Sequence, residues 1–168
     1  METMSVWLAN PLDGAIIALA RQSVREYVAN VSLLSIPASE PCCHHMAIWQ
    51  EKPIPVIFTG HRFQQDVANI LVLATRDSDV TEVGLAVSTT PGKLDIDDRW
   101  FADFRPSSCG IWQSVLISGF ARNRESIPII DPTRLVSNTS KFIRDANAVC
   151  FKPRQNRIGA QSYLQGQM

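Results

Sequence analysis

The chain has few of the features that mark secreted or membrane-spanning proteins. Its four cysteines, Cys42, Cys43, Cys109 and Cys150, are irregularly spaced, so the sequence indicates reduced thiols and not a disulfide framework. No apolar run approaches the roughly 20 residues that a membrane-spanning helix needs. No basic region precedes the apolar stretch at 16–20, as a signal peptide would require. We therefore expect a soluble protein of the cytoplasm.

The chain also lacks net charge. Its 16 basic residues balance its 16 acidic ones, so no overall field attracts nucleic acid or a membrane surface. Apolar residues make up 45% of the chain and charged residues 19%, which is ordinary for a globular protein. With 168 residues and no repeat or linker, the chain is long enough for one domain with a sizeable core.

Helix signals occur in three places. Asn10 and Pro11 form a helix start, and apolar residues then recur at steps of three and four positions. A similar recurrence follows Phe63, and Asp131 with Pro132 marks a further helix start. The spacing predicts helices over residues 11–33, 63–74 and 132–150.

Strand signals alternate with these helices. Short apolar runs between proline, glycine and polar residues predict strands at 54–58, 82–89, 98–104 and 126–130. The turn at 90–93 would make 82–89 and 98–104 a hairpin. Residues 111–120 fit a helix or a strand, and the alternation with serine favours a strand.

These elements predict an α+β fold. It would hold a mixed sheet of about four to five strands, with a central hairpin and about three helices packed on it. We expect one domain over residues 1–152, and a flexible tail over 153–168, which is polar and rich in glutamine. Residues 37–53 are expected to form an irregular loop.

The strongest candidate site is the turn of Thr59, Gly60, His61 and Arg62. A strand that enters a helix through such a turn leaves backbone N–H groups free to bind an anion. Arg62 could add a guanidinium, Thr59 a hydroxyl and His61 a group that titrates near neutral pH. In the alternative interpretation Gly60 only supplies backbone freedom and Arg62 is solvated. The pattern predicts a site for a phosphate of a nucleotide or a nucleic acid.

The same stretch, FTGHRF, resembles the Gly-x-x-Arg turn that precedes a helix in the ParB/sulfiredoxin fold. It has one residue fewer between Gly60 and Arg62 than that pattern, and the likeness covers only residues 54–67. The resemblance implies handling of nucleotide phosphates or DNA, with Gly60, His61 and Arg62 at the centre.

Carboxylates gather in the segment LDIDDRWFADF. Asp95 and Asp97 would share one face of a strand, with Asp98 beside them. Paired carboxylates can hold Mg²⁺ or carry out acid–base chemistry. The alternative is a charged edge strand, which resists pairing with other chains.

A second possible metal site is the run Cys42, Cys43, His44 and His45. Thiolate and imidazole are zinc ligands, but adjacent side chains diverge and no Cys-x-x-Cys pair completes the set. The spacing therefore argues against zinc, and no cofactor is predicted firmly.

Basic residues gather near the C-terminus. Such a run could contact nucleic-acid phosphates, although basic residues in the last turn of a helix also complement its dipole. The residues are Lys141, Arg144, Lys152, Arg154 and Arg157.

No pattern supplies a complete set of nucleophile, base and electrostatic stabiliser. The leading hypothesis is therefore a regulatory or accessory binding protein with its ligand site at 59–62. One alternative is an enzyme acting on a phosphate ester or nucleotide, in which Asp95, Asp97 or Asp98 holds the metal. Another is an assembly protein whose segment 153–168 becomes ordered on a protein partner. Oligomeric state is left open.

Overall fold

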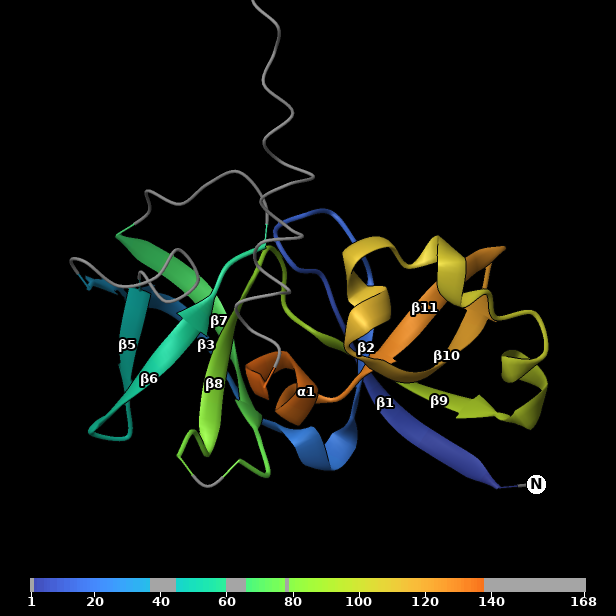
Figure 1. The fold of residues 1–168 in the computed structure, drawn as a ribbon, viewed down its shortest axis with the longest axis horizontal. Coiled ribbons are helices and arrows are strands. Elements are labelled where there is room, and N and C mark those ends of the chain that lie inside the picture. The colour runs from blue at the N-terminus through green and yellow to red at the C-terminus, as the bar shows by residue number, and fades with distance from the viewer. Residues whose placement is uncertain (1, 37–44, 60–65, 78, 138–168) are drawn as a thin grey trace, which may run out of the picture.

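The protein consists mainly of strands. The computed structural model describes residues 2–36, 45–59, 66–77 and 79–137. Two mixed sheets stand side by side, and the helix α1 (Pro132–Ser137) lies between them (Figure 1). The described residues contain no other α-helix. The expected α+β fold with about three helices is therefore wrong.

The five-stranded sheet is formed by both ends of the described chain. Its edge strands, β10 (Leu116–Arg122) and β9 (Gly92–Asp97), approach each other through the 3₁₀ turn η2 (Asp98–Phe101). There Trp100 packs edge-on against Phe120 with ring centroids 6.0 Å apart. Further 3₁₀ turns, η3 (Pro106–Ser108) and η4 (Gly110–Ser114), precede β10. In spatial order the strands are β10 (Leu116–Arg122), β11 (Glu125–Ile130), β2 (Ile17–Ala20), β1 (Thr3–Ala9) and β9 (Gly92–Asp97).

The six-stranded sheet is formed by the middle of the chain. Its two edge strands follow each other in sequence with only Leu33 between them, so the sheet curls until its edges meet. The indole Nε1 of Trp49 donates to Glu26 Oε2 at 2.7 Å and joins β5 to β3. In spatial order the strands are β3 (Val24–Ser32), β7 (Val67–Ala74), β8 (Glu82–Val87), β6 (Lys52–Ile57), β5 (His45–Trp49) and β4 (Leu34–Ser35).

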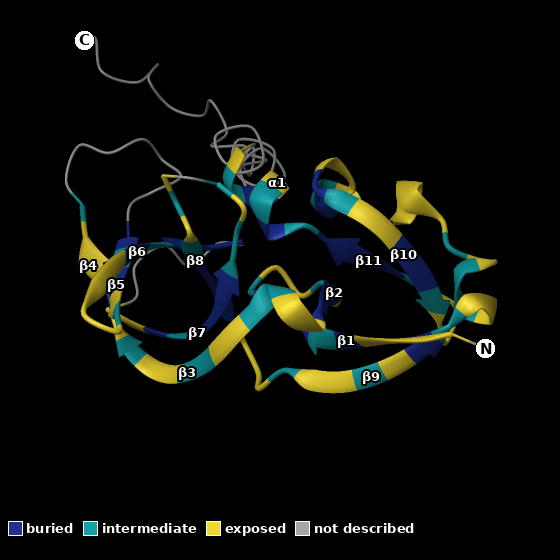
Figure 2. Cartoon of the chain, turned by 90° about the horizontal axis from the view of Figure 1, so that it is seen from below, coloured by how far each residue is buried: buried dark blue, intermediate teal, exposed yellow. Residues whose placement is uncertain are grey.

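Three apolar clusters organise these sheets. One lies inside the five-stranded sheet around Phe120, and a second lies inside the six-stranded sheet around Ile70 and Val72. The third, which we call the inter-sheet core, fills the space between the sheets. Figure 2 shows the burial pattern: β3 has no buried residue, and the start of β9 is exposed. The inter-sheet core comprises Ala9, Ile17, Leu19, Ile57, Leu71, Leu73, Val83, Leu85, Val87, Cys109, Trp112, Val115, Ile130 and Leu135.

Residues 11–33 do not form the expected helix. They contain β2, the 3₁₀ turn η1 (Arg21–Ser23) and β3. In β2, Ile17 and Leu19 face the inter-sheet core while Ala18 faces the interior of the five-stranded sheet. The apolar residues that suggested one face of a helix belong to several elements. Their spacing of three and four positions therefore did not indicate a helix.

The helix expected at 63–74 is also wrong, because residues 67–74 form the strand β7. Leu71 and Leu73 face the inter-sheet core, whereas Ile70 and Val72 face the interior of the six-stranded sheet. A strand buried on both faces is apolar at nearly every position. Such a run also satisfies the three- and four-residue spacing of a helix, which explains the error.

Several strand predictions are confirmed, but their pairing is not as expected. Strands occur near 54–58, 82–89 and 126–130. Residues 98–101, however, form η2, and β8 pairs with β7 and β6. β9 pairs with β1 and not with β8. The ambiguous segment 111–120 is divided between η4 and β10.

A glycine in β10 allows an aromatic ring to lie against the sheet. A Cβ placed on Gly119 would come within 2.1 Å of the Phe104 ring. We expect Gly119→Ala to lower the free energy of unfolding by about 1–3 kcal/mol through overpacking, measured by urea denaturation. Gly92→Ala is the matched control, because a Cβ there meets nothing within 4 Å.

The combination of Gly119→Ala with Phe104→Leu should recover part of that loss, because the smaller side chain vacates the space. If Gly119→Ala and Gly92→Ala had equal effects, the packing of Phe104 on Gly119 would not matter for stability.

Candidate functional site

Of the 59–62 turn the structure describes only Thr59, so an anion site there stays a prediction. Thr59 is fully buried after β6, and its hydroxyl has no hydrogen-bond partner among the described residues. Gly60, His61 and Arg62 lie outside the described residues. Residues 67–74 are a strand, so that part of the expected helix is absent. The described part therefore lacks the strand–turn–helix unit on which the resemblance to the ParB/sulfiredoxin fold depended.

The carboxylates of β9 already have partners within the chain. Asp95 Oδ1 accepts a hydrogen bond from the Ser5 hydroxyl. Asp97 accepts from the backbone N–H of Arg99 at 3.0 Å and from its guanidinium at 2.7 Å. Asp98 begins η2. The described residues contain no group of three or more side chains placed to hold a metal ion, so magnesium binding by Asp95, Asp97 and Asp98 stays a prediction.

The basic residues Lys141, Arg144, Lys152, Arg154 and Arg157 lie outside the described part of the chain. Nucleic-acid contact through them therefore stays a prediction.

Of the Cys-Cys-His-His run, only His45 is described. It is buried, and its ring packs against Phe58 with centroids 4.9 Å apart. The remaining members, Cys42, Cys43 and His44, lie outside the described residues.

Cys109 is a free and buried thiol. Its Sγ lies 3.9 Å from the carbonyl oxygens of Arg105 and of Ser126. Burial raises the pKa of the Cys109 thiol. Because the thiolate is the reactive form, we interpret this residue as part of the core.

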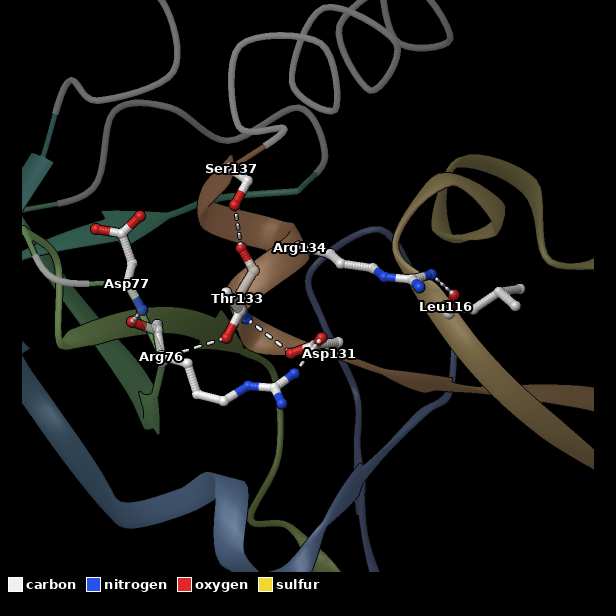
Figure 3. A network of polar contacts seen from close by, with 8 residues as sticks. Arg76, Asp77, Leu116, Asp131, Thr133, Arg134 and Ser137 are labelled. Carbon is white, nitrogen blue, oxygen red and sulfur yellow. Dashed lines mark hydrogen bonds and ion pairs between the residues drawn. The ribbon is translucent and has the colours of Figure 1, made fainter.

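A polar clasp ties α1 to both sheets (Figure 3). Asp131 caps α1 by accepting from the backbone N–H of Thr133 at 3.0 Å, and it forms an ion pair with Arg76 at 3.2 Å. The Thr133 hydroxyl accepts from the backbone N–H of Arg76 at 2.9 Å. On the other side, the Arg134 guanidinium donates to the carbonyl of Leu116 at 2.7 Å. The clasp therefore joins the loop after β7 to the start of β10.

An apolar surface covers the outside of β4, β5 and β6. Ala47, Ile54 and Val56 point inward, so the alternate residues of these strands point outward. Leu34 lies opposite Met46, Met46 opposite Pro55, and Ile48 opposite Pro53. We call the five residues Leu34, Met46, Ile48, Pro53 and Pro55 the outer face.

The outer face has its most exposed large side chains at Leu34 on the edge strand β4 and at Ile48 on β5. Leu34 and Ile48 are each 54% exposed, which makes them the most exposed large apolar side chains among the described residues. Contiguous apolar surface of this kind marks sites of protein interaction more often than scattered apolar residues do. Residues 37–53 were expected to be a loop, and that expectation is wrong for β5 (His45–Trp49), whose burial alternates although its letters do not.

Comparisons with known proteins identify the fold. No protein-family model and no curated protein sequence matches the chain. Among solved structures, the chain is similar to the scaffolding protein TtCheW from Thermoanaerobacter tengcongensis, with a TM-score of 0.64 and 18% sequence identity. The match covers 83% of this chain and 96% of the other. The two chains share a fold rich in strands.

No helix in the described part of the chain is both long enough and apolar enough to cross a membrane.

The pairing of Asp97 with Arg99 predicts a pH-dependent contribution to stability. The Arg99 side chain, followed by its backbone N–H, holds the pKa of the Asp97 carboxyl below its usual value of 3.8. A lowered pKa in the folded state stabilises the protein above pH 3.8, and this stabilisation is lost as the pH falls through the folded pKa. We expect Asp97→Asn to be slightly less stable than wild type at neutral pH and equal to it in strong acid, measured by urea denaturation.

Asparagine at 97 can still accept from the Arg99 backbone, so this change isolates the charge. Asp98→Asn is the matched control, because no hydrogen bond or ion pair of the described residues involves the Asp98 carboxylate. If the difference in free energy of unfolding between wild type and Asp97→Asn did not depend on pH, this interpretation would be wrong.

Proposed function

We propose that the protein is a scaffold that binds a protein partner through the outer face of its six-stranded sheet. The observation that carries the proposal is the exposure of Leu34 and Ile48 beside Met46 on paired strands. Their burial against a complementary apolar surface would contribute about 25 cal/mol for each Å² removed from water.

The geometry of the outer face supports a stable docking surface. The inward-facing residues of the same strands, such as Ala47 and Ile54, are almost fully buried. The hairpin between β5 and β6 closes through Gln50 and Glu51, both with positive φ, as a tight two-residue turn requires. Because the backbone beneath the outer face is held by paired strands, binding would require little ordering, which favours affinity.

The similarity to a scaffolding protein supports the same proposal at the level of fold. TtCheW is a scaffolding protein. A scaffold acts by binding other proteins and needs no catalytic centre. At 18% identity the shared fold does not assign a partner, so the proposal depends on the surface of this chain. The partner we propose is a folded protein that presents an apolar patch of its own.

The test is the double variant Leu34→Ser with Ile48→Ser. We expect it to fold normally and to lose the partner, measured by chemical crosslinking in the producing cells followed by mass spectrometry. Ile117→Ser is the matched control, because Ile117 is 51% exposed on the other sheet. The control should retain every crosslink.

Sedimentation of the purified protein distinguishes two possible occupants of the outer face, a different protein and a second copy of this chain. A dimer that the double variant abolishes would assign the face to a second copy of the chain and overturn the proposal of a different partner. Equal crosslinking by the double variant and the control would overturn the role of the outer face altogether.

A further inference from the structure

A cavity of about 890 Å³ opens beside the five-stranded sheet, whereas the outer face lies on the six-stranded sheet. Three segments line it: the connection at 14–16, the 3₁₀ region at 103–112 and the hairpin region at 121–128. Its volume lies within the range of about 300–1,000 Å³ that ligand sites occupy. The cavity is therefore large enough to receive several side chains of a bound peptide.

The floor of the cavity includes accessible apolar surface. Ile16 is 37% exposed, while Trp112 and Ile127 are almost fully buried. The Trp112 indole donates to Asp13 Oδ2 at 2.9 Å, which fixes the ring. The backbone N–H of Arg105 donates to the Ser126 hydroxyl at 2.9 Å and joins two of the walls. A floor arranged in advance in this way can accept an apolar side chain without reorganising.

The rim carries two arginines and two carboxylates. The four residues, Asp103, Arg105, Arg124 and Glu125, are all exposed. The two salt bridges found among the described residues involve none of them. Both guanidiniums can therefore form paired hydrogen bonds with a carboxylate from outside the chain.

The turn that contains Arg124 has the same left-handed backbone as the turn at Gln50 and Glu51. Asn123 and Arg124 form the turn between β10 and β11, with φ of 51° and 67°. The second position of such a turn favours glycine, since a side chain there is strained. The chain thus places the guanidinium of Arg124 at the rim in a backbone conformation that glycine would adopt more easily.

We infer that the cavity binds a peptide segment of a protein partner in which a carboxylate side chain lies next to a large apolar one. The arginines would pair with the carboxylate, the floor would take the apolar side chain, and Asp103 and Glu125 would accept backbone N–H groups of the peptide. A ligand made of phosphates alone would leave Asp103 and Glu125 without donors, whereas the N–H groups of a peptide would supply them. The inference rests on the proposed function, and it names a second docking site on the other sheet.

The experiment is an NMR titration of the full chain with the blocked peptide acetyl-Leu-Asp-Phe-Asp-Leu-amide. We expect shifts at the Trp112 indole N–H and at the backbone of residues 121–128. Combining Arg105→Ala with Arg124→Ala should weaken binding about tenfold or more, because each charged hydrogen bond is substantial. Arg122→Ala is the matched control, because this arginine lies on the same hairpin but does not line the cavity.

A single substitution separates binding from stability. Arg124→Gly should raise the thermal midpoint, because it relieves the strained backbone, while it weakens the peptide. A residue with a purely structural role would not show these opposite changes. Unchanged peptide binding in Arg124→Gly would overturn the role of this arginine.

The remaining outcomes decide the inference as a whole. It is overturned if the acidic peptide causes no shifts at Trp112 at about 1 mM, or if the peptide with lysine in place of aspartate binds equally well. The variant with Leu34→Ser and Ile48→Ser should bind the peptide normally. If the peptide does not bind the cavity while crosslinking still depends on the outer face, this inference is wrong and the proposed function stands.

Discussion

The packing of the two sheets against each other is the contact on which the rest of the structure depends. Leu71, Leu73 and Leu85 on one side meet Ile17 and Leu19 on the other. Because β7 and β8 also line the interior of their own sheet, these strands are buried on both faces. Neither sheet can shift without exposing apolar surface. The inter-sheet core therefore fixes the position of each sheet, and of the residues on it, relative to the other sheet.

Because the two sheets are fixed relative to each other, the two proposed docking sites are fixed relative to each other as well. The outer face lies on the six-stranded sheet and is apolar, whereas the cavity on the five-stranded sheet combines an apolar floor with a charged rim. The clasp around Asp131 and the hydrogen bond from the Ser88 backbone to Asn10 at 2.8 Å join the sheets at further points. Two partners bound at these sites would be held at a defined distance and orientation.

The sequence predicts the elements whose boundaries are local. Pro53 lies near the start of β6 and Gly60 follows its end, and polar residues frame β11, so both strands could be identified from the letters near them. β2 and β7 could not, because burial on two faces removes the alternation that distinguishes a strand from a helix. The outer face was missed for another reason. Leu34 and Ile48 are brought together by the pairing of β4 and β5, and no spacing along the chain encodes that pairing.

The path of the chain also orders its assembly during synthesis. All strands of the six-stranded sheet come from the continuous stretch 24–87, whereas β1 and β2 leave the ribosome before it and β9, β10 and β11 after it. The middle sheet can pair as soon as it emerges, since folding units form in the order in which they are made. β1 must wait for β9, so a strand that is made early is among the last to complete its pairing.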